Sequence, residues 1–169
     1  MLFEIHNGAI QTTAAPTAVT TGTSIKTMLQ FKASATLAAK IAAWAISFDG
    51  YLAATPIKVE LIETDVAATV TAYVAADITK VDADAIACGD PTTNLIQVGT
   101  SASGYTSTNE GSITSVRNLE IPQFIAPTTQ FVQRYSLDEM PVVQVAKFAR
   151  IRVTAPAAVN CYCGLWIKL

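Results

Sequence analysis

Few residues in this sequence could carry catalysis. The single histidine, His6, lies near the start of the chain, and no G-x-S-x-G motif presents a nucleophilic serine. The pair Asp82-x-Asp84 has carboxylates that could act as general acid and base, but an exposed turn explains this spacing more simply. We therefore predict that the protein is not an enzyme.

Metal and phosphate chemistry is also weakly supported. Residues 77–90 (DITKVDADAIACGD) offer several acids, but they lack the glycine at position six and the glutamate at position twelve of a calcium loop. A weak, loop-bound cation remains an alternative. No glycine-rich loop has the lysine and the strand-to-helix context of a phosphate site. We therefore expect neither a metal nor a cofactor.

Three cysteines, Cys88, Cys161 and Cys163, give an odd count without a C-x-x-C motif. Cys161 and Cys163 share one face of a predicted strand, so their Cα atoms are about 6.5–7 Å apart, which does not suit a mutual disulfide. A tetrahedral metal site would need further ligands. We expect these residues to behave as small buried hydrophobic side chains in a reducing compartment.

The composition points to a neutral surface. Charged residues make up only 14% of the 169 residues, against about 25% in typical soluble proteins, while 28 alanines and 22 threonines are available to cover the exterior. Such a surface suits contact with other subunits; an ordinary monomer rich in small residues is the alternative. The eleven lysines and arginines are scattered, so direct nucleic-acid binding is not expected.

Membrane insertion and secretion are not indicated. The first ten residues, MLFEIHNGAI, have neither a basic region nor a continuous apolar run, so no signal peptide is predicted. The uncharged run at 153–167 is shorter than a membrane span and contains Pro156 and Asn160. We expect a soluble protein made in the cytoplasm.

Alternation of apolar and polar residues predicts several β-strands. Residues 24–32, 40–48 and 56–63 each alternate with a period of two. The alanine-rich run before residue 40 would also suit a helix, so 33–39 is left unassigned. A short helix is considered near Asp77. Further short strands are expected within 112–119, 122–127, 129–137 and 145–154, whereas the Gly/Ser-rich 99–111 is expected to be a surface segment.

The last predicted strand, 159–169, is apolar on both faces. Cys163 and Leu165 alternate with Tyr162 and Trp166. A strand with two apolar faces is normally covered on both sides. We expect the core to cover one face and a partner to cover the other.

About eight short strands, long loops and little helix predict an all-β fold, a β-sandwich or jelly roll. Residues 25–169 are expected to form a single domain. Residues 1–24 are expected to be an N-terminal arm or edge segment, because much of this stretch is Thr/Ala/Gly/Pro-rich and without charge.

Aromatic residues at strand positions have two interpretations. They could form a platform on which a sugar stacks, although aromatic residues in strands are more often core or interface anchors. The residues concerned are Trp44, Tyr51, Tyr105, Tyr135, Tyr162 and Trp166.

Three stretches together resemble the decoration, or cement, proteins of tailed-bacteriophage capsids. They are the run from Arg150 through IRVTAPAAVN and the following strand to Trp166, the run WAISFDG…TPIKVELIETD at 44–65, and LDEMPVV at 137–143. The resemblance implies a β-sandwich or jelly-roll homotrimer on the outside of the phage head, at three-fold junctions of the major capsid protein. Other decoration or fibre proteins are further partners to consider.

This resemblance implies a structural role in the virion. Candidate interface residues are Tyr162, Trp166 and Tyr135, together with Thr12 and Thr13 of the N-terminal segment. The alternative is a glycan-binding β-sandwich module of a phage tail or head fibre, which would use exposed aromatic residues.

Overall fold

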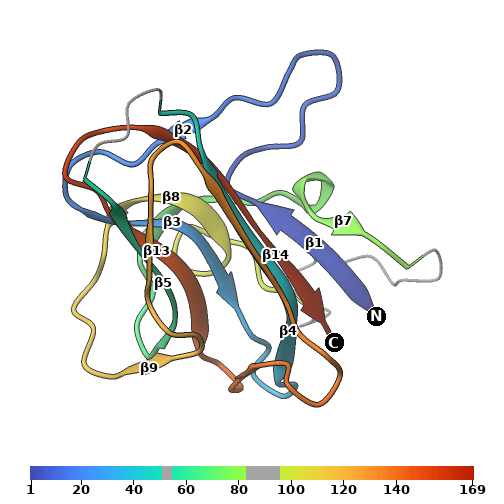
Figure 1. Ribbon diagram of the computed structural model, residues 1–169. Coiled ribbons are helices and arrows are strands. Elements are labelled where there is room, and N and C mark those ends of the chain that lie inside the picture. Colours follow the sequence, from blue (N-terminus) through green and yellow to red (C-terminus); the bar gives the residue numbers. More distant parts are fainter. Residues whose placement is uncertain (51–54, 83–95) are drawn as a thin grey trace.

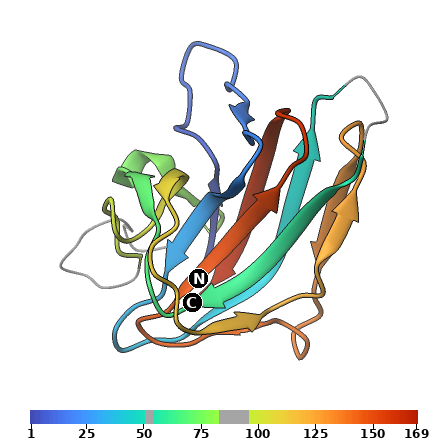
Figure 2. The same ribbon diagram turned by 90° about the vertical axis from the view of Figure 1, so that its left-hand side faces the viewer.

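The computed structural model describes residues 1–50, 55–82 and 96–169. These residues form two antiparallel β-sheets that face each other, with almost no helix (Figures 1 and 2). The all-β sandwich predicted from the sequence is therefore confirmed. We call the two layers sheet A and sheet B.

Each sheet combines strands that are far apart in the sequence. Sheet A has the order β11-β4-β14-β1-β7, with β12 paired to β4 and β2 to β14; sheet B has the order β10-β5-β13-β3-β8-β6, with β9 paired to β5. The strands of sheet A are β1 (Leu2–His6), β2 (Val19–Thr20), β4 (Ala39–Phe48), β7 (Thr79–Lys80), β11 (Gln130–Arg134), β12 (Val142–Val143) and β14 (Asn160–Lys168). Those of sheet B are β3 (Ile25–Lys32), β5 (Ile57–Thr64), β6 (Thr69–Ala72), β8 (Gly104–Asn109), β9 (Val116–Asn118), β10 (Gln123–Ile125) and β13 (Phe148–Thr154).

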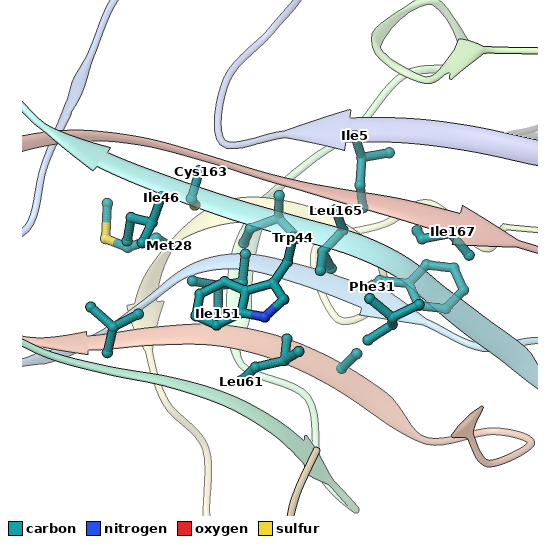
Figure 3. Close-up of a cluster of buried hydrophobic side chains, with 14 of the residues drawn as sticks. Ile5, Met28, Phe31, Trp44, Ile46, Leu61, Ile151, Cys163, Leu165 and Ile167 are labelled. Carbon is teal, nitrogen blue, oxygen red and sulfur yellow. The ribbon is translucent and has the colours of Figure 1, made fainter. Parts of the chain in front are cut away.

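The inner faces of the two sheets enclose one hydrophobic core (Figure 3). Because successive side chains of a strand point to opposite faces, every second residue of the central strands enters this core. Trp44 of β4 and Leu165 of β14 come from sheet A, and Leu61 of β5 and Ile151 of β13 come from sheet B. The strands predicted at 40–48 and 159–169 agree closely with β4 and β14.

The N-terminal segment differs from the expectation of an arm or edge segment over 1–24. Leu2–His6 form β1, which lies inside sheet A between β14 and β7. Its side chains Phe3 and Ile5 are buried in the core. The composition of the following residues suggested an arm, but pairing with the distant strands β14 and β7 decides the place of β1 in the sheet. The segment 7–18, between β1 and β2, projects beyond the end of the sandwich (Figures 1 and 2).

The helix considered near Asp77 is not formed. A single 3-10 turn, η1 (Ala75–Asp77), ends at this residue. The Asp77 carboxylate is buried and accepts hydrogen bonds from the backbone N–H of Val74 at 3.0 Å and of Ile10 at 3.1 Å. Asp84 and Cys88 lie outside the described residues. Within the described ranges no helix is long and apolar enough to cross a membrane.

The Gly/Ser-rich stretch 99–111 also differs from its prediction as a surface segment, because it contains β8 in the interior of sheet B. Gly104 allows this pairing. A Cβ atom at this position would lie 2.2 Å from the carbonyl oxygen of Thr71 in β6, a separation that no side chain could tolerate. The small residue therefore marks a close approach of two strands.

Candidate interaction surface

Over its strands β3 and β13, the outer face of sheet B is covered by the chain's own segments. Arg150 of β13 donates from Nη1 to the carbonyl oxygen of Glu110 at 3.0 Å and from Nη2 to the carbonyl oxygen of Val66. Gln30 of β3 accepts from the backbone N–H of Ala68 at 2.8 Å and donates to the carbonyl oxygen of Ala102 at 2.5 Å. These contacts hold the loop after β5 and the segments flanking β8 over the sheet.

The layer over sheet B is charged but internally paired. Arg150 is 0% exposed, and its guanidinium lies 3.4 Å from a carboxylate oxygen of Glu110. Burial lowers the pKa of Arg150, and the charge of Glu110 partly opposes this shift. The Glu110 carboxylate also accepts from the backbone N–H and the hydroxyl of Thr27, both at 2.6 Å. This face is therefore satisfied within the chain.

The outer face of sheet A has a different character, because small residues lie along its middle. Ala45 of β4 pairs with Gly164 of β14, and Ala43 pairs with Trp166. A Cβ atom at Gly164 would lie 3.1 Å from the carbonyl oxygen of Ile5. The result is a shallow trough, because the outward positions of β14 alternate between a large side chain and a glycine that has none.

Three adjoining hollows extend along this trough. The central one, of about 180 Å³, is lined by Tyr162 and Trp166 at positions two residues on either side of Gly164. A second, of about 210 Å³, shares Trp166 and adds Tyr135 and Met140. A third, of about 200 Å³, shares Tyr162 and lies against the segment 7–18. We call the central and second hollows, which share Trp166, the sheet A trough; the third hollow lies beside it, beneath the segment 7–18.

The candidate residues from the sequence occupy different parts of this surface. Tyr162 is 38% exposed on the outer face of β14, and Trp166 is half-buried on the same face. Tyr135 lies beside Trp166 in the second hollow. Thr12 and Thr13 are exposed in the projecting segment and line none of the three hollows. The structure thus groups the three aromatic residues and leaves the two threonines apart from them.

Tyr135 is fixed rather than free. Its hydroxyl donates to a carboxylate oxygen of Glu120 at 2.6 Å, and its backbone N–H donates to the carbonyl oxygen of Ala42 at 3.0 Å. Burial and the contact with Glu120 raise the pKa of Tyr135 well above its usual value. The ring is therefore a rigid wall of the hollow.

Two parts of the surface were missed by the sequence argument. One is β11, whose Gln130 and Val132 line the central hollow; the alternation within this strand could have indicated that face. The other is the open side of the sandwich. It is formed by β10, the edge strand of sheet B, and β11, the edge strand of sheet A, which are consecutive in the chain. Ile121 is 75% exposed there and Phe124 is 72% exposed. Exposed apolar side chains of this size indicate an interaction site when they gather on one side.

Trp44 belongs to the core and not to a sugar platform. It is fully buried, and its ring centroid lies 4.9 Å from that of Phe131. Of the other aromatic candidates, Tyr51 lies outside the described residues, and Tyr105 lines the third hollow together with Tyr162.

The described residues contain no candidate metal site, and their two cysteines are buried. None of the described residues form a group of three or more His, Cys, Asp or Glu side chains that could hold a metal ion. Cys161 and Cys163 are free thiols buried in the core, as their sequence positions predicted. Burial raises the pKa of Cys163 well above its usual value, which keeps the thiol protonated and unreactive.

Comparison with known proteins adds no relative. The chain matches no protein-family model, no curated protein and no solved structure. The resemblance to capsid decoration proteins is accordingly carried by the quoted stretches of sequence alone. The functional argument therefore depends on the surface described above.

Proposed function

We propose that this protein is a structural virion protein, a capsid decoration protein that binds the outer surface of a phage head and bridges subunits of the major capsid protein. The observation that carries the proposal is the contrast between the two outer faces. Over β3 and β13, the outer face of sheet B is closed by a hydrogen-bonded layer of the chain itself, while the sheet A trough stays uncovered and is lined largely by small and aromatic residues.

The physical requirements of the role fit this architecture. A protein that reinforces a shell needs a rigid body and broad contacts with more than one neighbour, and it needs no reaction centre. The two-layer sandwich supplies the rigid body. The sheet A trough and the open side with Ile121 and Phe124 are two separate apolar surfaces, which is what one contact to a copy of the same chain and another to the capsid would require.

We assign the sheet A trough to contact between three copies of this chain, and the open side to the capsid. Light scattering coupled to gel filtration should then give a mass near three times that of the 17.9 kDa chain. Cryo-electron microscopy of virus particles that carry the chain should show the sandwich on the outer shell. A strict monomer at high concentration, or density only in the tail, would contradict the proposal.

The alternative, a glycan-binding module of a tail or head fibre, loses one of its supporting residues because Trp44 is buried. It retains Tyr105 and Tyr162, which line a hollow beneath the projecting segment. A sugar site at that hollow is compatible with either role.

A further inference from the structure

The third hollow lies where the projecting segment 7–18 passes over the end of β1. It has a volume of about 200 Å³ and is built from three parts of the fold. Tyr105 comes from β8 of sheet B, Tyr162 comes from β14 of sheet A, and Gln11 and Thr17 come from the segment itself. Residues distant in the sequence therefore converge on one partly open hollow.

The segment that covers the hollow is held in place from both sides. The Asn7 side chain donates to the carbonyl oxygen of Cys161 at 3.1 Å and accepts from the backbone N–H of Cys163 at 2.9 Å. Further along, the backbone N–H of Ile10 donates to Asp77, and the Tyr162 hydroxyl donates to the carbonyl oxygen of Pro16. A cavity whose walls are already fixed costs less conformational entropy when a ligand binds.

The Tyr105 ring is also fixed in orientation. It packs against the ring of Tyr73 at a centroid distance of 5.4 Å and an interplanar angle of 47°. Tyr73 in turn donates its hydroxyl to the carbonyl oxygen of His6 at 2.6 Å. The Tyr105 hydroxyl is kept protonated, because burial first and the nearby charge of Asp77 second raise its pKa.

Several polar groups around the hollow are left available. Among the described residues, the Tyr105 hydroxyl, the Thr17 hydroxyl and the His6 imidazole have no hydrogen-bond partner. Among the described residues, no Lys, Arg, Asp or Glu side chain lines the hollow. The lining thus offers two aromatic rings and the hydroxyls of Tyr105 and Thr17, and it suits an uncharged polar ligand.

We propose that this hollow binds a single neutral pyranose unit. The C–H groups of a pyranose carry partial positive charge and pack against the negative faces of aromatic rings, here Tyr105 and Tyr162. Its hydroxyls would bond to Thr17, Gln11 and the Tyr105 hydroxyl. A few placed polar groups within a largely apolar lining are the usual composition of a small-molecule site. The site is independent of the proposed decoration role and does not require trimer formation.

The test is a titration of the ¹⁵N-labelled protein in which binding is detected from changes in the amide chemical shifts. The four probes are the methyl glycosides of glucose, galactose and mannose, and N-acetylglucosamine. We expect at least one probe to give saturable shifts centred on Gly8, Gln11 and Thr17, with a dissociation constant on the order of 1 mM. If all four probes give no saturable shift at concentrations of about 50 mM, the proposal is wrong.

A matched pair of variants localises the binding. Thr17→Val removes a hydroxyl that lines the hollow, whereas Thr13→Val makes the same change outside it. Loss of one hydrogen bond should weaken binding about fivefold in Thr17→Val, and Thr13→Val should bind as the original chain does. Tyr105→Phe keeps the ring and should also lose about fivefold. Equal affinity in all three variants, with unchanged folding by circular dichroism, would overturn the site.

The sugar bound could be a free or terminal unit, or one unit within a longer glycan. To distinguish these, the affinity for each monosaccharide is compared with the affinity for its linear oligosaccharide. A similar dissociation constant for both supports a site for one terminal or free sugar. An affinity at least tenfold tighter for the oligosaccharide supports a site within a longer glycan-binding surface that includes the sheet A trough. Binding of the oligosaccharide that is unaffected by Thr17→Val and Tyr105→Phe contradicts the proposal.

Discussion

Arg150 shows how one side chain holds the layer that closes sheet B. It is fully buried, yet two of its nitrogens donate to the carbonyl oxygens of Glu110 and Val66, and the Glu110 carboxylate lies near it. Its Nε atom is one of the buried atoms without a hydrogen-bond partner in the described part of the chain. Burying a charge is unfavourable unless it is paired, so the contacts to Glu110 and Val66 are required for this arrangement to be stable.

Replacing this residue should therefore be costly. We expect Arg150→Ala to lower the free energy of unfolding by about 3–5 kcal/mol, because Glu110 would lose its buried counter-ion. Arg134→Ala, a matched change at an exposed arginine of β11, should stay within about 0.5 kcal/mol of the original chain. Urea denaturation of both variants measures the difference. Equal losses would show that the layer does not depend on Arg150.

Among the elements, β14 connects the core to the sheet A trough. It pairs with β4 on one side and β1 on the other. Leu165 points into the core, and its neighbours Gly164 and Trp166 point outward. A single strand thus carries both the packing that stabilises the sandwich and the surface proposed for contact between copies.

Two adjacent substitutions in β14 separate these roles. Leu165→Ala removes a fully buried side chain and should lower the free energy of unfolding by about 2–5 kcal/mol. Trp166→Ala removes a half-buried outward ring. At protein concentrations too low for assembly, we expect Trp166→Ala to change the free energy of unfolding by about 1 kcal/mol or less. At higher concentration, we expect the same substitution to abolish the trimer. Thermal unfolding and light scattering measure the two effects. A Trp166→Ala loss as large as that of Leu165→Ala would place this ring in the core.

At the scale of the whole molecule, charge is distributed unevenly between the two sheets. Buried and half-buried ion pairs gather on sheet B and its flanks, where Lys58 and Arg152 flank Glu60 at 2.8 Å and 3.1 Å. The central hollow of the sheet A trough is lined mostly by uncharged residues such as Ala45, Gly164 and Tyr162, with the carboxylate residue Glu4 among them. Association through that trough should be driven by removal of apolar surface from water.

This distribution predicts an assembly that tolerates salt. Because dissolved ions screen charge pairs but do not weaken apolar burial, the trimer fraction at a fixed protein concentration should be unchanged between about 0.05 M and 0.5 M sodium chloride. Analytical ultracentrifugation across this range measures it. Dissociation as salt increases would indicate an ionic interface, and would direct attention to Glu4 and Arg134, which line the hollows, and to Lys168 at the end of β14.

The sequence by itself determined the class of fold and most of the long strands. Period-two alternation located β4 and β14 to within about one residue because alternation follows directly from the geometry of a half-buried strand. It also identified Tyr162 and Trp166 as one face of β14. The burial of Cys161 and Cys163 was expected from the apolar character of free cysteine and is confirmed.

Only the tertiary structure decided which face of each strand is covered. Residues of β14 are apolar on both faces, so alternation could not choose between them; the pairing of Leu165 with Trp44 turns both inward and leaves Trp166 outside. The interior position of β1, the strand within 99–111 and the hollow beneath the projecting segment likewise depend on contacts between distant residues. Such contacts are set by long-range packing, which local propensity does not encode.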